Sequence, residues 1–339
     1  MLEFAADYGL FLLKVATIVA AIAVLIAIGA AAGKRAQSET LEVENLNDKY
    51  RELATALRRA LLAKDSRKKL DKEEKARRKA DAKAERARPR SFVIDFRGDL
   101  KASAVPSLRE EVTAILDVAR EDDEVVVRLE NYGGVVHEHG LAAAQLVRLR
   151  DRGIRLTVAI DKVAASGGYL MACVADRVVA APFAVVGSIG VIAQIPNFNR
   201  ALETRGVDFE EITAGKYKRT VTMFGKNTDE DRAKLKSDLE DVHELFKAVV
   251  NRYRPALDLE RVATGEHWYG SRALDLGLID ELSTSDELLV ESSRERDLFR
   301  VRFRLRKGLK ERLASGVDAA LERADIAAWR RRFESRLPR

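Results

Sequence analysis

The sequence has few of the residues that usually carry disulfide, metal or redox chemistry. It contains one cysteine, Cys173, and only four histidines and three methionines among 339 residues. A single cysteine excludes an internal disulfide, and we expect Cys173 to be a small core residue. The chain has no H-E-x-x-H pair, no cysteine cluster and no series of spaced aspartates, so we expect no metal site. It also has no P-loop, and we expect no nucleotide or other cofactor.

Aromatic residues are scarce as well, at 6% of the chain, whereas charged residues make up 34%. The net charge of +6 is unevenly distributed, because residues 64–90 and the tail from Arg294 are strongly basic. A basic run can bind nucleic acid, but here it has no interleaved aromatic residues and belongs to no recognisable binding module. We therefore expect no nucleic-acid partner, and anionic lipid is the alternative partner for this charge.

One long apolar run stands near the N-terminus. Residues 9–33 carry a single charge, at Lys14, and are long enough to cross a bilayer. The pattern predicts a transmembrane helix over 9–33 after a short tail, residues 1–8. A cleaved signal peptide fits less well, because the residues before the run are acidic and the run is long. Lys34 and the basic residues beyond it follow the run, so the positive-inside rule predicts a cytoplasmic C-terminal domain.

Residues 34–90 are typical of a charged helical stalk. Leu46, Tyr50, Leu53 and Leu57 follow the 4-3-4 spacing of a helix seam. Self-association, contact with the next domain and a plain spacer all remain open as roles for this seam.

Residues 91–285 alternate between short apolar runs and amphipathic segments, which predicts an α/β domain. Residues 286–339 add a basic strand from Asp297 and an amphipathic helix over 309–338. The expected strands of the domain are 91–97, 124–130, 155–161, 177–181 and 186–192, and the expected helices are 105–120, 138–152, 166–175 and 228–253.

The segment Val163-Ala-Ala-Ser-Gly-Gly-Tyr169 is the strongest candidate for chemistry. It places Ser166 between a buried strand and a helix, where free N–H groups favour a developing anion. The adjacent glycines leave the backbone open to a substrate. An N-cap serine followed by glycines for close packing is the alternative interpretation.

Three further segments accompany this serine. A diglycine in Asn131-Tyr-Gly-Gly134 follows a strand and is suited to aim an N–H at an oxyanion. Val186-Gly-Ser-Ile-Gly-Val191 holds a second serine, and Ala214-Gly-Lys-Tyr-Lys-Arg219 holds Lys216 and Lys218. The nearest histidines, His137 and His139, are expected to be surface-loop residues. A Ser-Lys pair is therefore favoured over a Ser-His-Asp triad.

In this order, the three segments V-A-A-S-G-G-Y, V-G-S-I-G-V and A-G-K-Y-K-R resemble the signal peptide peptidase A family of Ser-Lys proteases. Within that family the chain is most similar to the short inner-membrane members with one protease domain. The resemblance implies a ClpP/crotonase-like superhelix of strand-strand-helix units, preceded by one transmembrane helix and a charged stalk. It also implies a bacterial inner-membrane location, peptide or protein substrates, and a homo-oligomeric ring in which neighbouring subunits complete the site.

The resemblance also implies a role for each site residue. Ser166 would be the nucleophile, Lys218 the general base and Ser188 the residue that orients the lysine amine. The N–H of Gly167, with one from Gly133 or Gly134, would form the oxyanion hole. The family usually has Ser-Pro before the diglycine, whereas this chain has Asn131-Tyr132, which changes the oxyanion loop. A solvated lysine has a pKa of about 10.4, so the base would have to be buried to lose its proton near neutral pH.

These observations predict a membrane-anchored serine endopeptidase that works through an acyl-enzyme. Its expected substrates are remnant signal peptides or unfolded segments of membrane proteins. Two alternatives stay open: an anchored scaffold that keeps the pocket without activity, and a crotonase-like acyl-CoA enzyme that uses neither Ser166 nor Lys218.

Overall fold

The computed structural model describes residues 14, 17, 19, 39–83 and 88–305. Residues 41–303 form one compact unit, and the two chain ends, 1–40 and 304–339, form a second. The helices predicted over 9–33 and 309–338 lie outside the described residues, apart from positions 14, 17 and 19. Among the helices that are described, none is both long and apolar enough to cross a membrane.

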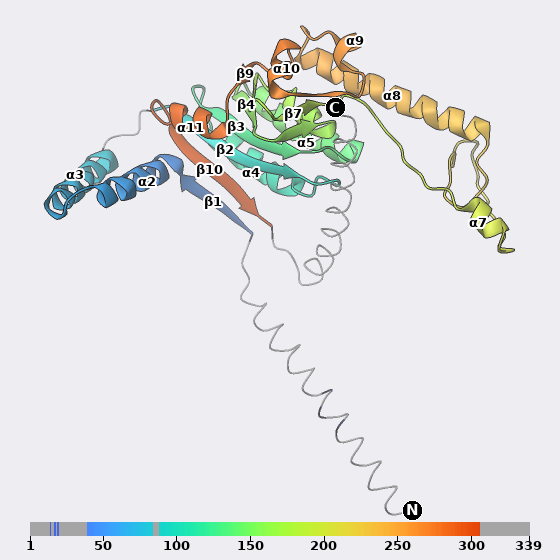
Figure 1. Ribbon diagram of the computed structural model, residues 1–339, viewed down its shortest axis with the longest axis horizontal. Coiled ribbons are helices and arrows are strands. Elements are labelled where there is room, and N and C mark those ends of the chain that lie inside the picture. Colours follow the sequence, from blue (N-terminus) through green and yellow to red (C-terminus); the bar gives the residue numbers. More distant parts are fainter. Residues whose placement is uncertain (1–13, 15–16, 18, 20–38, 84–87, 306–339) are drawn as a thin grey trace, which may run out of the picture. The chain divides into compact units, whose positions relative to one another are not determined.

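A ten-stranded sheet organises the compact unit (Figure 1). Along its main path, every pair from β10 to β9 is parallel. A short branch leaves the path at β3, where β5 (Val163–Ala165) pairs with β3 and with β7 (Val185–Gly187), and β7 pairs antiparallel with β8 (His267–Tyr269). The main path runs β1 (Thr40–Asn45), β10 (Asp297–Arg304), β2 (Arg90–Gly98), β3 (Glu124–Asn131), β4 (Arg155–Ile160), β6 (Arg177–Ala180) and β9 (Glu281–Leu282).

Helices bury one face of this sheet. The strand alternation of β2 and β3 directs Ile94 and Val127 into the main core, where they are fully buried. Leu108 of α4 (Val105–Val118) and Leu146 of α5 (Val136–Arg150) belong to the same core. The predicted α/β architecture is confirmed, and β4, β5 and α6 (Gly167–Ala172) form one strand-strand-helix unit. The remaining helices of this part are α7 (Asn199–Glu203), α8 (Asp229–Tyr253), α9 (Leu259–Val262), α10 (Gly270–Asp275) and α11 (Ser285–Ser292).

The basic C-terminal strand belongs to the sheet. We expected it within a separate segment, residues 286–339, but β10 lies between β1 and β2. The reason is that its alternating pattern has apolar partners on both faces. Val301 packs into the main core, whereas Leu298 joins a second buried cluster with Val93 and Leu289. The intervening arginines are paired, and Arg302 lies 3.3 Å from the Asp95 carboxylate.

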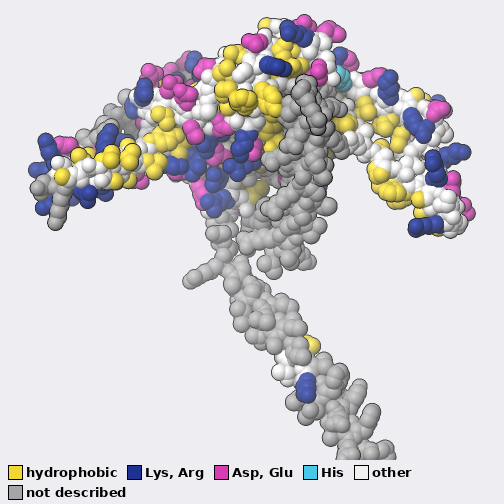
Figure 2. Space-filling model, viewed as in Figure 1, with side chains coloured by type: hydrophobic (Ala, Val, Ile, Leu, Met, Phe, Trp, Pro, Cys, Tyr) yellow, Lys and Arg dark blue, Asp and Glu magenta, His cyan; other side chains and the backbone are white. Residues whose placement is uncertain are grey.

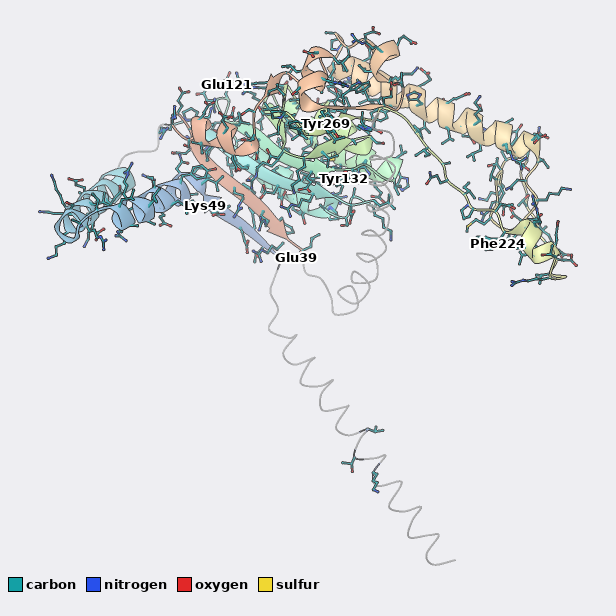
Figure 3. The ribbon with its side chains drawn as sticks, in the orientation of Figure 1. Glu39, Lys49, Glu121, Tyr132, Phe224 and Tyr269 are labelled. Atoms are coloured by element: carbon teal, nitrogen blue, oxygen red, sulfur yellow. The ribbon has the colours of Figure 1, made fainter. Side chains whose placement is uncertain are left out.

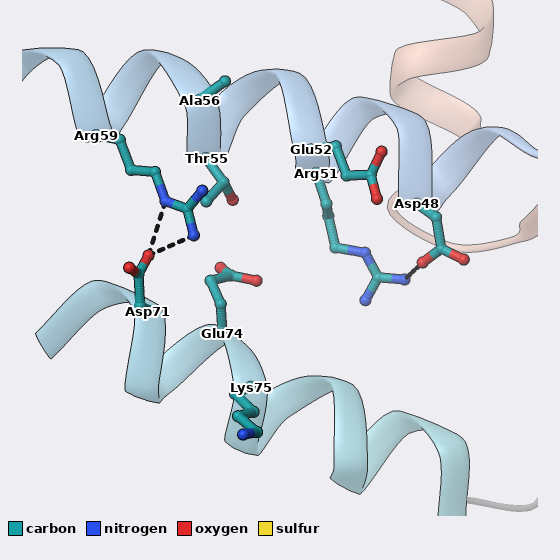
Figure 4. Close-up of a pocket in the computed structure, with 9 residues that line it drawn as sticks. All are labelled: Asp48, Arg51, Glu52, Thr55, Ala56, Arg59, Asp71, Glu74 and Lys75. Carbon is teal, nitrogen blue, oxygen red and sulfur yellow. Dashed lines mark hydrogen bonds and ion pairs between the residues drawn. The ribbon is translucent and has the colours of Figure 1, made fainter. Parts of the chain in front are cut away.

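The stalk begins as part of this body. Residues 40–45 form a strand instead of the expected helix, and α2 (Leu46–Leu61) then starts with Leu46 and Tyr50 packed on the second cluster. Farther along the same seam, Leu53 and Leu57 are exposed. The opposite, polar face of α2 lies against α3 (Lys64–Lys83), where Arg59 and Asp71 form an ion pair at 2.5 Å (Figure 4). Of the four seam residues, Leu46 and Tyr50 therefore contact the next domain and Leu53 and Leu57 do not.

Two predicted elements near the candidate site are shorter than expected. The strand predicted over 186–192 ends at Gly187, because Ser188 has a left-handed φ of 54° that breaks the strand. The helix predicted over 166–175 covers Gly167–Ala172. Residues 188–198 then continue without regular structure toward α7.

Candidate active site

Ser166 occupies a sharp corner between β5 and α6. Its φ of 52° and ψ of −118° lie outside the regions that ordinary residues favour. For a residue with a Cβ such a conformation costs about 1–2 kcal/mol, and strain of this kind concentrates at functional sites. The Ser166 N–H donates to the Gly187 carbonyl at 2.8 Å, which fixes the corner. The side chain is half-buried, so it is open to a substrate at the start of a helix.

The second serine stands beside the first. β5 and β7 are parallel and pair Ala165 with Gly187, so Ser166 and Ser188 follow the matched ends of two neighbouring strands. Ser188 has nearly the same left-handed φ as Ser166, at 54°, and its N–H donates to the Glu266 carbonyl at 2.6 Å. The structure therefore brings together the two serines that the sequence singled out.

The diglycine loop, residues 133 and 134, packs directly against Ser166 and Gly167. Gly133 has a φ of 85°, and a Cβ built on it would lie 2.8 Å from the Ser166 Cβ and 2.9 Å from the Gly167 nitrogen. Its own N–H donates to the Asn131 side-chain oxygen at 2.8 Å. Within the described ranges, the N–H groups of Gly134 and Gly167 donate to no other residue. Of the two glycines proposed for the loop, Gly134 is thus the one with a free N–H.

Lys218 is placed differently. Its side chain is exposed, and in the part of the chain that the structure describes no hydrogen bond or ion pair joins it to Ser166 or Ser188. Its segment is tied to the start of α8: the Lys216 amine lies 3.1 Å from the Glu230 carboxylate, and the Lys234 amine lies 5.2 Å from the centre of the Tyr217 ring. Within one chain, Lys218 is not the buried lysine that a Ser-Lys dyad needs.

The long helix α8 carries this lysine segment away from the core. Of its residues, Phe246 and Val250 are buried against the body. Phe246 lies sixteen positions after Glu230 on this helix, which is about 24 Å at the helical rise of about 1.5 Å per residue. The segment holds its own aromatic cluster, in which Phe224 (labelled in Figure 3) lies 6.2 Å from Phe198 and 5.8 Å from Phe209 between ring centres. Figure 2 shows hydrophobic side chains exposed among the charged ones around α7.

The two histidines beside the diglycine have different environments. His137 is exposed, as expected, but the prediction for His139 was wrong, because His139 is fully buried on α5. Burial lowers the pKa of His139 below its ordinary value, although its bond to the Val135 carbonyl opposes the shift. Cys173 is a buried core residue as predicted, and burial raises the pKa of its thiol to about 12. The described ranges contain no group of three side chains suited to hold a metal ion.

Two buried residues that pack against the Ser166 corner, Asn131 and His139, were not identified from the sequence. Asn131 ends β3 as a fully buried polar residue, and its side chain occupies the space left by Gly98. The signal for Asn131 was present, since an asparagine at the end of an apolar strand needs hydrogen-bond partners. Nothing in the local pattern marked His139 as buried, because its environment is set by residues distant in the sequence.

Two family descriptions match the chain. Residues 148–298 match "Peptidase family S49" and residues 3–146 match "Peptidase family S49 N-terminal". Among curated relatives, a "Probable protease SohB" of Haemophilus influenzae is 45% identical over 318 residues, which is 89% of this chain and 90% of that protein. Another of that name, from Buchnera aphidicola subsp. Acyrthosiphon pisum, is 54% identical over 226 residues and covers 67% of each chain.

Solved structures give more distant matches. One is a lysine-to-alanine variant of the 1510-N membrane-bound stomatin-specific protease in complex with a substrate peptide. It is 13% identical, with a TM-score of 0.42, and the match covers 68% of this chain and 98% of that one.

Proposed function

This chain belongs to peptidase family S49, and from that premise we propose that it is a membrane-anchored serine endopeptidase with Ser166 as nucleophile and Lys218 as general base. The observation that carries the proposal is the Ser166 corner. A strained serine begins a helix between Gly133 and Ser188, with the N–H groups of Gly134 and Gly167 unengaged. An ordinary helix cap has open N–H groups as well, but it needs neither the strain at Ser166 nor a second open donor from a separate loop.

In the proposed reaction, these groups act in the following order. The Ser166 Oγ attacks the peptide carbonyl carbon while the Lys218 amine takes its proton. The carbonyl oxygen becomes an oxyanion and accepts hydrogen bonds from the N–H groups of Gly167 and Gly134. The tetrahedral intermediate expels the amine, which takes the proton back from Lys218, and an acyl-enzyme remains. Water, deprotonated by the same lysine, attacks the ester carbonyl. The second tetrahedral intermediate expels the Ser166 Oγ, which takes that proton from Lys218 as the acid is released.

We place Lys218 in the active site of a second copy of the chain. Two features support this arrangement: the lysine segment is attached to α8 about 24 Å along the helix from its core contact, and it exposes apolar side chains. A neighbouring copy that covered this surface would bury the amine beside its own Ser166 and Ser188. Desolvation favours a neutral lysine, which is the form that accepts a proton. A ring of such head-to-tail contacts would complete every site.

Mixing inactive variants tests this arrangement. Ser166→Ala and Lys218→Ala should each abolish peptide cleavage by the full-length protein in detergent or nanodiscs. Co-expressed, they should regain part of the wild-type activity, because some neighbours then pair an intact serine with an intact lysine. Lys216→Ala serves as the matched control and should remain active alone. If both dyad variants are inactive and the mixture stays inactive, the lysine acts within its own chain.

We further propose that residues 9–33 anchor the protein to the bacterial inner membrane, with the catalytic domain on the cytoplasmic side. The support is the uncharged run and the basic residues that follow it. Substrates in that position would be extended peptides, such as remnant signal peptides or unfolded segments of membrane proteins. Deletion of residues 1–38 should move the protein from the membrane pellet to the supernatant after carbonate extraction. Retention in the pellet would exclude this anchor as the main attachment.

A further inference from the structure

A buried polar pair lies directly behind the corner that holds Ser166. Asn131, at the end of β3, and His139, one turn into α5, are both completely inaccessible to solvent. A buried amide and a buried imidazole lower stability unless their polar atoms find partners. The partners they find here belong to the oxyanion loop.

Short polar contacts connect the pair to the start of α5 and to the diglycine. Both oxygens that face the imidazole are acceptors, so the neutral ring donates its one N–H to the Val135 carbonyl or to the Asn131 amide oxygen. The His139 Nδ1 lies 3.0 Å from the Val135 carbonyl oxygen, and its Nε2 lies 3.2 Å from the Asn131 Oδ1. The same Oδ1 accepts the Gly133 N–H at 2.8 Å. The Asn131 amide nitrogen, in turn, lies 3.3 Å from the Met171 sulfur of α6. The Asn131 side chain thus contacts both Gly133 of the diglycine loop and Met171 of α6, the helix that follows Ser166.

Three glycines show how closely the pair fits its surroundings. A Cβ built on Gly167 would lie 2.6 Å from the His139 Cγ, and a Cβ on Gly98 would lie 2.4 Å from the Asn131 Cγ. A Cβ on Gly168 would lie 2.3 Å from the Asn131 carbonyl oxygen. The imidazole therefore packs on the backbone of Gly167, while the amide fills the space beside β2. Movement of either side chain would move one of the two oxyanion donors.

We propose that Asn131 and His139 are positioning residues that fix the separation of the Gly134 and Gly167 N–H groups. The inference rests on the function proposed above and deepens it. An oxyanion hole works only when its donors lie 2.7–3.1 Å from the developing charge, so it needs a rigid support. Tyr132 lacks the ring by which a proline fixes its own φ. The bond from Gly133 to Asn131 closes a turn around Tyr132 and removes that freedom.

Substitutions at Asn131 separate this role from simple packing. Asn131→Leu keeps the size and removes the acceptor, so kcat should fall about 100-fold, the loss typical of one misplaced oxyanion donor, with KM changed less than threefold. Asn131→Asp keeps both acceptor contacts and gives His139 an anionic partner, so kcat should stay within about 10-fold of wild type. Gln145→Leu is the matched control, because Gln145 is a buried polar residue of α5, the helix of His139, and its amide oxygen accepts a hydrogen bond from Arg148.

The measurements use the full chain in nanodiscs, a fluorogenic peptide and an acid-quenched burst experiment. The expected pattern is a slow acylation burst in Asn131→Leu, recovery in Asn131→Asp and a wild-type burst in Gln145→Leu. A second variant, His139→Phe, is used in case Asn131→Leu does not fold. It keeps a ring against Gly167 but loses the contact of Nε2 with Asn131. We expect it to lower kcat about 10-fold.

Two results would overturn the inference, and they differ in what they imply. A wild-type acylation rate in folded Asn131→Leu and His139→Phe would show that the pair is structural only, and would leave the Ser166 mechanism intact. Failure of wild-type protein to acylate at Ser166 would remove the proposed function together with this inference.

Discussion

Gly133 offers the most direct structural test of the oxyanion loop. Its φ of 85° costs an alanine about 1–2 kcal/mol. The added methyl group would also lie 2.8 Å from the Ala165 carbonyl oxygen and from the Ser166 Cβ. These atoms belong to the corner at residues 165 and 166, which cannot yield as the end of a flexible side chain would, so the loop must move by about 0.5 Å to restore normal contact distances.

A shift of that size is enough to disable one donor, because the hole tolerates only a narrow range of distances. We therefore expect Gly133→Ala to lower kcat by about 10²–10³, equivalent to about 3–4 kcal/mol of transition-state stabilisation. The folded state should lose about 1–3 kcal/mol from strain and overpacking. A continuous peptide-cleavage assay and thermal unfolding of the same sample measure the two effects separately.

Gly140 provides the matched control for this experiment. It lies on α5, seven residues farther along, and a Cβ built there meets no atom within 4 Å. Gly140→Ala should raise stability by about 0.5–1 kcal/mol through helix propensity and leave kcat unchanged. If Gly133→Ala keeps wild-type kcat while it loses stability, the loop does not form part of the active site.

Three further predictions concern a buried carboxyl group, a buried hydroxyl group and the choice between two lysines. The pKa of Glu111 is raised by burial from the ordinary value of 4.5 to about 7, and its carboxylate accepts the Phe303 N–H at 2.8 Å. The folded state then binds this proton more tightly than the unfolded state does. The protonated Glu111 side chain therefore adds about 3 kcal/mol to the free energy of unfolding below pH 4.5, and this contribution is lost as the pH rises through about 7. Glu111→Gln should remove this difference in urea unfolding between pH 5 and 8, and an unchanged pH dependence would contradict the assignment. Tyr169→Phe should cost about 1–2 kcal/mol, because the buried hydroxyl donates to the Leu278 carbonyl at 3.0 Å; equal melting temperatures would contradict it. Lys216→Ala should keep kcat within about threefold while Lys218→Ala abolishes cleavage, since Lys216 is paired with Glu230 at the surface; the opposite ranking would make Lys216 the base.

Local sequence patterns predicted the centre of the fold well. The apolar runs at 91–97, 124–130 and 155–161 became β2, β3 and β4, because strand alternation and buried β-branched residues are properties of short segments. The small residues around Ser166 predicted a strand, a corner and a helix for the same reason. The pairing of the two serines was not predictable from spacing alone, since it depends on the register between β5 and β7.

Non-local contacts explain where the predictions were incomplete. β1 and β10 come from opposite ends of the described chain and are neighbours in the sheet. The sequence pattern of either segment alone does not show that the other is its partner. The burial of His139 depends on Asn131 and Gly167, which come from two other elements. The segment that carries Lys218 is held by its neighbours against the start of α8, where Lys216 pairs with Glu230 and Tyr217 faces Lys234. The local sequence does not show whether such a lysine is buried or solvated.

The acyl-enzyme tests the central claim most directly. The full-length assembled protein would be mixed with a short peptide p-nitrophenyl ester, quenched in acid within the burst phase and digested for mass spectrometry. We predict that the acyl group is found on the peptide that contains Ser166, that Ser166→Ala carries none, and that Lys218→Ala acylates far more slowly. Peptide turnover by the wild-type protein with the acyl group on another residue, or turnover undiminished in Ser166→Ala, would contradict the account.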